Sequence, residues 1–276
     1  MKKKRWLLYT IFGLVFYLLF LIVQMPASWF AWGLNRYTQG SVRLDPIAGS
    51  LWNGNGRLVI YYPQTTPHDF GRAEWGINPL WLFAGRLQIH WQATAPDTSI
   101  YTTLRLGFGQ TQLVDLDISF PAQSVSTFYP AATLLSPKGQ VRVRTAKLSI
   151  DQSGIEGNGE ILWNNASSSL SSVQPLGDYR LELTGAGKTT HLKLTTSRGD
   201  LEFTGAGQWQ LATGQIQLSG SATARARAEE LEPLLRLMGN DQGAGRRTLM
   251  LNTSVPPATW LAQQDRPAAV APANPK

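Results

Sequence analysis

Much of the chain between residues 57 and 252 alternates apolar and polar residues in short runs, which is the pattern of half-buried β-strands. Gly, Asn, Asp or Ser residues separate the runs. Connections this short join antiparallel neighbours and leave no space for crossover helices. The pattern therefore predicts an all-β antiparallel meander, folded as a curved sheet or a sandwich, with strands at 57–62, 85–93, 104–108, 114–120, 139–144, 179–183, 191–194, 200–203, 208–211, 215–218 and 248–252.

Two segments of this region have helical spacing instead. In the segment 228–239, four apolar residues recur at intervals of one, three and four, and a glycine ends the pattern. The segment 124–139 has a weaker pattern of the same kind. We therefore expect one or two short helices, the firmer of them with an apolar face made of Leu231, Leu234, Leu235 and Met238.

The β region is expected to cover residues 41–255 and to contain an internal duplication. The sequence GNGRLVI begins at Gly54, and GNGEILW begins 103 residues later. The proline residues of the two helical segments are separated by the same interval. This offset predicts two similar halves, 41–145 and 146–255. The Pro- and Ala-rich end, 256–276, lacks either periodicity and is predicted to be a mobile tail.

The N-terminal segment has a different pattern, in which four cations precede an uncharged, mostly apolar run from Trp6 to Val23. At about 1.5 Å per residue, 18–20 helical residues span a hydrocarbon core of roughly 30 Å. A cleaved signal peptide, which is the alternative, has a shorter apolar core of about 7–15 residues. We therefore interpret residues 6–25 as a transmembrane signal-anchor, preceded by the basic head Lys2, Lys3, Lys4 and Arg5.

The basic head predicts the direction of insertion, because cations next to an anchor stay in the cytoplasm. Residues 1–5 are then cytoplasmic and the β region is translocated, which in a bacterium places it in the periplasm. Residues 26–40 form an interfacial linker in this interpretation. Its Trp29, Phe30 and Trp32 suit the far membrane interface, where aromatic rings are enriched. The predicted location is the bacterial inner membrane, crossed once.

Charge beyond the head does not indicate a nucleic-acid-binding protein. The net charge is +7, but outside the head 21 cations face 18 carboxylates. No later basic run is longer than a pair, so the chain lacks a stripe of cations that could follow a phosphate backbone.

The segment LELTGAGKT, which begins at Leu181, ends like a nucleotide-binding phosphate loop. Such a loop needs a glycine five residues before its G-K-[ST], and that position is Glu182. The similar LEFTGAGQ at 201–208 has glutamine in place of the lysine, and an alternating strand pattern follows Lys188. We interpret both segments as strands that end in glycine turns, and we expect no nucleotide.

Residues capable of catalysis or metal binding are few. The chain has no cysteine, which excludes disulfides, thiolate catalysis and thiolate metal sites. His68, His90 and His191 are isolated from one another and from carboxylates at metal-ligand spacing. Asp115 and Asp117 are expected to share an exposed strand face. We therefore predict no catalytic residues, no metal site and no cofactor, and we expect a protein that is not an enzyme.

Several motifs distributed along the chain together resemble the protein N family of bacterial type II secretion systems. They follow the basic head and anchor in a fixed order: GSLWNGNGRL at 49–58, EWGINPLWLFAGRLQIHWQ at 74–92, PLGDYRLEL at 175–183 and ELEPLLRLMG at 230–239. The resemblance implies an accessory component of the inner-membrane platform, partnered by other secretion subunits and without catalytic activity.

The same arrangement of Trp, Pro-Leu and a glycine before a strand also resembles the AsmA-like envelope proteins. That resemblance implies a β groove that binds or conducts lipid. The two readings differ physically: either the apolar sheet face is covered by protein, or it stays open as a groove for acyl chains.

Overall fold

The computed structural model describes residues 2–61, 68–128, 130–239, 241–243 and 245–255. Its contacts divide the chain into two compact units, unit 1 (Met1–Gly107) and unit 2 (Phe108–Lys276). The predicted tail, 256–276, lies outside the described residues.

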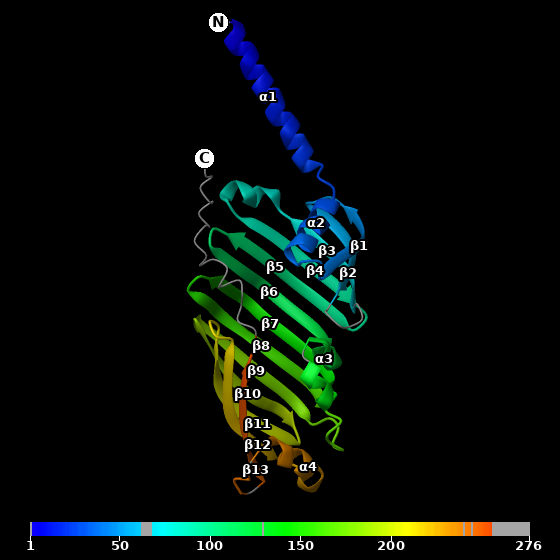
Figure 1. The fold of residues 1–276 in the computed structure, drawn as a ribbon, viewed down its shortest axis with the longest axis vertical. Helices are drawn as coiled ribbons and strands as arrows, with labels where there is room; N and C mark the ends of the chain where they lie inside the picture. The colour runs from blue at the N-terminus through cyan, green and yellow to red at the C-terminus, as the bar shows by residue number, and fades with distance from the viewer. Residues whose placement is uncertain (1, 62–67, 129, 240, 244, 256–276) are drawn as a thin grey trace, which may run out of the picture. The chain divides into compact units, whose positions relative to one another are not determined.

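The described residues of unit 1 form two helices, a 3-10 turn and five strands that pair antiparallel in sequence order (Figure 1). They are α1 (Lys2–Val23), α2 (Ser28–Tyr37), β1 (Val42–Gly49), β2 (Asn53–Ile60), β3 (His68–Ile77), η1 (Pro79–Ala84), β4 (Leu87–Ala95) and β5 (Thr98–Gly107).

The core of unit 1 forms where α2 packs on this sheet. Phe30 of α2 stacks on Trp75 of β3, with 4.5 Å between ring centroids and 14° between ring planes. Small residues such as Ala73, which is fully buried, let the helix approach the strands. The segment predicted as a linker, 26–40, therefore contains a helix that covers the sheet.

In the part of unit 2 that the structure describes, eight strands also pair antiparallel in sequence order. Its elements are β6 (Gln110–Pro121), η2 (Ala122–Ser124), α3 (Val125–Phe128), η3 (Pro130–Leu135), β7 (Lys138–Asp151), β8 (Gly154–Ser167), β9 (Gly177–Gly187), β10 (Thr189–Gly199), β11 (Leu201–Gln210), β12 (Gln215–Ala224), α4 (Ala228–Met238) and β13 (Arg246–Ser254).

The β-meander and the firmer helix are confirmed. Each predicted strand overlaps an observed one, and the predicted segments 200–203 and 208–211 are mostly parts of the single strand β11. The apolar residues of α4 pack as expected, since Leu231, Leu234 and Leu235 are all buried. The weaker helical segment forms the short turns η2, α3 and η3.

The suspected phosphate loop is a β-hairpin. Gly187 ends β9 with φ 69°, Lys188 forms the turn, and Thr189 begins β10. The predicted reading of this segment as strand, glycine turn and strand is therefore confirmed.

The two compact units do not coincide with the two predicted halves. The units divide after Gly107, whereas the predicted boundary at 145/146 falls inside β7. A helical segment does precede the last strand at both predicted positions, with η2, α3 and η3 before β7 and α4 before β13. Internal similarity of sequence stays a prediction.

Candidate functional site

The sheet of unit 2 has one apolar face. Alternate residues of a strand point to opposite sides, and the register aligns apolar residues from strand to strand. One row crosses all eight strands, and we call the side that carries it the apolar face. The row consists of Ile118, Val143, Ile161, Leu181, Leu194, Gly205, Gly220 and Leu249.

One end of the apolar face is closed by α4 and by the segment between β8 and β9. Leu231 and Leu235 of α4 pack with Val173, Leu201 and Tyr179 in a cluster of buried residues. The hydroxyl of Tyr179 donates a hydrogen bond of 3.1 Å to the carbonyl of Leu201, and burial raises the pKa of this phenol. Figure 1 shows α4 at the end of the strands rather than across their middle.

The row across the apolar face is only partly covered, whereas Leu192 and Leu218 in the next row are buried. Every residue of the row across the eight strands is half-buried, and none reaches the burial of the cluster beneath α4. An apolar surface that extends over several strands and stays accessible is characteristic of a binding surface. The apolar face can therefore accept an apolar ligand or the apolar side of a partner.

The opposite, polar face carries paired charges. Arg142 donates a hydrogen bond of 2.8 Å to Asp117, and Arg144 lies 3.6 Å from Asp117 and 3.8 Å from Glu160. Arg180 lies 3.7 Å from the same glutamate. The hydrogen bond from Arg142 holds the pKa of the Asp117 carboxyl below its usual value. Since cations and carboxylates alternate here, this face suits contact with water.

Strand β13 forms an edge of the sheet. Within the described residues it pairs with β12 on one side, in unbroken register from Arg246 to Ser254, and on its other side Arg247 forms a single bridge to Asp241. It contains no proline, and Met250 is 78% exposed. The first strand of unit 1, by contrast, is protected against pairing with another chain. A register irregularity interrupts β1, and Pro46 within it has no N–H to donate. A long, regular edge such as β13 can accept a strand from a partner.

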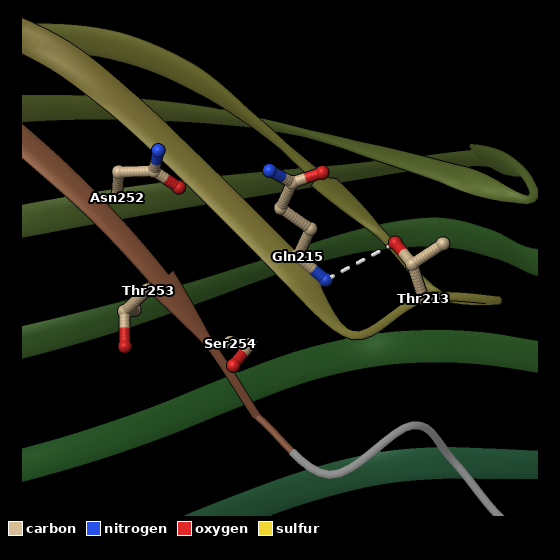
Figure 2. Close-up of a pocket in the computed structure, with 5 residues that line it drawn as sticks. All are labelled: Thr213, Gln215, Asn252, Thr253 and Ser254. Carbon is tan, nitrogen blue, oxygen red and sulfur yellow. Dashed lines mark hydrogen bonds between the residues drawn. The ribbon is translucent and has the colours of Figure 1, made fainter.

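Two pockets adjoin the β13 edge and share Asn252. One, of about 610 Å³, is lined by Thr213, Gln215, Asn252, Thr253 and Ser254. Figure 2 shows Asn252 and Gln215 on neighbouring strands, with Thr213 accepting a hydrogen bond from the backbone N–H of Gln215.

The second pocket, of about 460 Å³, extends from Met250 and Asn252 across β12 to β11. Both linings offer uncharged hydrogen-bonding groups beside the exposed Met250, which suits a peptide segment. The residue pattern alone does not identify Met250 or Asn252, because it does not show which strand forms the edge of the sheet. The only signal is that segment 248–252 is the last strand of a meander.

The N-terminal residues predicted to set membrane topology lie in α1. Lys2, Lys3, Lys4, Arg5 and Trp6 are in the first part of the helix, and their side chains lie outside the described set. Val23 is the last helical residue and is exposed, so the observed helix ends where the apolar run ends. Among the described residues, no helix combines the length and the hydropathy that a membrane crossing requires.

The three residues of the predicted aromatic belt lie on different sides of α2. Trp29 and Trp32 are on its outer side, 56% and 64% exposed. Phe30 instead packs against Trp75 in unit 1, where it is partly buried. The two tryptophans also line a pocket of about 440 Å³ with Ser28, and the belt itself stays a prediction.

The candidate chemical residues are dispersed. His90 contacts Gln88 at 2.9 Å and Thr103 at 3.0 Å, and His191 is exposed on β10, whereas the side chain of His68 lies outside the described set. In the described part of the chain, no three His, Asp or Glu residues are grouped so that they could hold a metal ion.

Comparison with known proteins gives one finding. A family model for protein N of the type II secretion system matches residues 40–250. Neither the comparison with curated proteins nor that with solved structures gives a match.

Proposed function

This chain belongs to the protein N family of type II secretion systems, and we propose that it is a non-catalytic accessory component of the inner-membrane platform. In this role it is a membrane-tethered periplasmic β scaffold, which supports export of folded proteins across the outer membrane. The observation that carries the proposal, beyond the family, is the regular β13 edge with its two adjoining pockets.

The tether in this proposal is α1. All large apolar side chains of α1 that the structure describes are exposed, from Tyr9 to Val23. Residues 1–44 contain no Asp or Glu, and four cations precede the apolar run. These features support insertion with the N-terminus in the cytoplasm and the β-units in the periplasm. Tethering would raise the effective concentration of the β-units near other anchored subunits.

The docking surface in this proposal is the β13 edge. Main-chain groups along an edge strand give affinity when a partner adds a strand, and neighbouring pockets select its side chains. Because Arg247 bridges Asp241, the part of β13 that can pair with an added strand is 248–254, which is still the usual length of a strand. The pockets beside Met250 and Asn252 would receive side chains of the added strand.

A photo-crosslinking amino acid at Met250 is expected to capture another secretion subunit in intact cells. The matched control is Phe108, which is even more exposed at 93% and lies away from the β13 edge. If exposure alone decided capture, Phe108 would react at least as well. Mass spectrometry of the adducts checks the prediction. Equal capture from both positions, or no subunit captured from Met250, would contradict docking at this edge.

A second function, binding of acyl chains, is favoured by the half-buried row of the apolar face. Acyl chains would cover apolar side chains that unit 2 leaves accessible. In this role the chain would resemble an AsmA-like groove, and the closed end beneath α4 would limit how far a chain can extend along the strands.

The test of the lipid function compares two neighbouring residues of β10 in the full chain. Leu194 is half-buried on the apolar face, and Thr195 is on the polar face. Leu194→Gln is expected to reduce the lipid that co-purifies, and Thr195→Gln is expected to leave it unchanged. Because the tether itself carries lipid, the readout is the difference between the variants, by mass spectrometry. Identical lipid content would remove this function.

A further inference from the structure

Unit 1 presents an apolar turn, η1, whose beginning and end are specified by residues of its own sequence. The side-chain oxygen of Asn78 accepts a hydrogen bond of 3.0 Å from the N–H of Leu80, which caps the first turn. Pro79 occupies the first position, where its missing N–H has no consequence. Gly85 ends the turn with φ 66°, a conformation that glycine adopts readily. The sequence therefore specifies the conformation of this turn.

This turn presents apolar side chains to the surroundings. Leu80 is 71% and Phe83 is 84% exposed, and Trp81 and Leu82 between them are exposed as well. Four consecutive exposed large apolar residues are unusual on a surface that faces only water. The segment 75–96 that contains them has no Asp or Glu.

Hydrogen bonds connect the position of η1 to the end of α1. The indole N–H of Trp52 donates to the carbonyl of Ile22 at 2.9 Å, and the N–H of Leu51 donates to the carbonyl of Met25 at 2.8 Å. The carbonyl of Trp52 in turn accepts from the N–H of Ile77 at 2.6 Å, two residues before η1 begins. The C-terminal end of α1, the β1–β2 turn and the start of η1 therefore lie at one end of unit 1.

From this arrangement we propose that η1, together with Trp29 and Trp32 of α2, inserts into the interfacial layer of the bilayer that holds α1. This inference rests on the proposed anchoring of α1. It commits unit 1 to a lipid surface, because Trp, Phe and Leu without acidic neighbours match the composition of interfacial membrane contacts. The contact would limit the tilting of unit 1 about its tether and so fix the orientation in which it meets partners.

The experiment uses site-directed spin labels on the full chain in vesicles of phosphatidylethanolamine and phosphatidylglycerol. The chain has no cysteine, so each single substitution gives one labelled position. Labels at Phe83→Cys, Leu14→Cys and Thr94→Cys report on η1, α1 and the exposed side of β4. Thr94 is seven residues along β4 from Leu87, about 23 Å at roughly 3.3 Å per residue.

Collisions with oxygen, which concentrates in lipid, and with a water-soluble nickel complex give the readout. The Phe83 label is expected to gain oxygen collisions and lose nickel collisions relative to the Thr94 label. If the Phe83 label behaves like the Thr94 label while the Leu14 label is in lipid, the inference is overturned and the anchor stands. Shielding of Phe83 from both reagents would indicate a protein partner and also overturn it. A Leu14 label exposed to nickel would overturn the proposed anchor and the inference with it.

Discussion

Leu231→Ala is expected to lower the free energy of unfolding of unit 2 by about 2–5 kcal/mol, the usual effect of truncating a buried leucine. Leu231 has no exposed surface and packs from α4 onto the cluster that contains Val173, Leu201 and Tyr179. Removal of its side chain would leave a cavity beneath the one helix that closes this end of the apolar face. Urea unfolding of the full chain in detergent, with hydrogen exchange read for unit 2, measures the change.

Met250→Ala is the matched control, since it removes a side chain of similar size that is 78% exposed. Its effect on the free energy of unfolding is expected to stay within about 0.5 kcal/mol. A similarly small effect for Leu231→Ala would mean that α4 is not held on the sheet, and that this end of the apolar face is open. The pair therefore tests the position of α4 and the extent of the accessible face together.

The strands that the sequence predicts are those whose apolar side chains alternate without interruption. Three observed strands lack that pattern, each for a physical reason. Strand β1 contains Pro46, which argues against a strand except at an edge or a bulge, and its register is irregular there. Strand β3 fills a core position with Ala73, and β8 has Gly157 and Gly159 where neighbouring strands have apolar residues. Small residues in the core give no hydrophobic signal.

The helical elements divide in a similar way. The apolar spacing of α4 is sufficient to predict both the helix and its buried face. The helix α2 is short and has aromatic residues on both of its sides. Phe30 faces the core of unit 1, and Trp32 faces outward. The aromatic residues on both sides of α2 are of types that suit a membrane interface. Only the packing of Phe30 on Trp75 shows which side faces the sheet. The exposure of η1 could not be predicted from the sequence either, since apolar residues usually indicate burial.

The candidate site depends on properties that single residues do not encode. Alternation predicts that the sheet has an apolar face, and the row from Ile118 to Leu249 is that face. Whether it is covered depends on where α4 comes to rest, and the sequence contains no signal for its position at one end of the strands. The charge pairs of the polar face, such as Arg142 with Asp117, likewise follow from register and not from proximity in sequence.

The pairing of β11 with β12 is expected to depend on a glycine in the row of the apolar face, and Gly220→Ala tests this. A Cβ at Gly220 would lie 2.0 Å from the carbonyl oxygen of Thr204 and 2.6 Å from the Cα of Gly205, both on the neighbouring strand β11. Because these are backbone atoms, they cannot move aside without separating β11 from β12. The substitution is therefore expected to lower the free energy of unfolding by about 1–3 kcal/mol, as overpacking does.

Gly159→Ala is the matched control on the same face. Its added Cβ would have the carbonyl oxygen of Arg144 as its nearest neighbour at 3.4 Å, an ordinary contact, and its backbone is not in the left-handed region. This variant is expected to be neutral or to gain about 0.4–1 kcal/mol, since alanine restricts the unfolded chain. The same urea unfolding compares the two. Equal effects would show that β11 and β12 accommodate a side chain at Gly220, and that their close approach does not require glycine there.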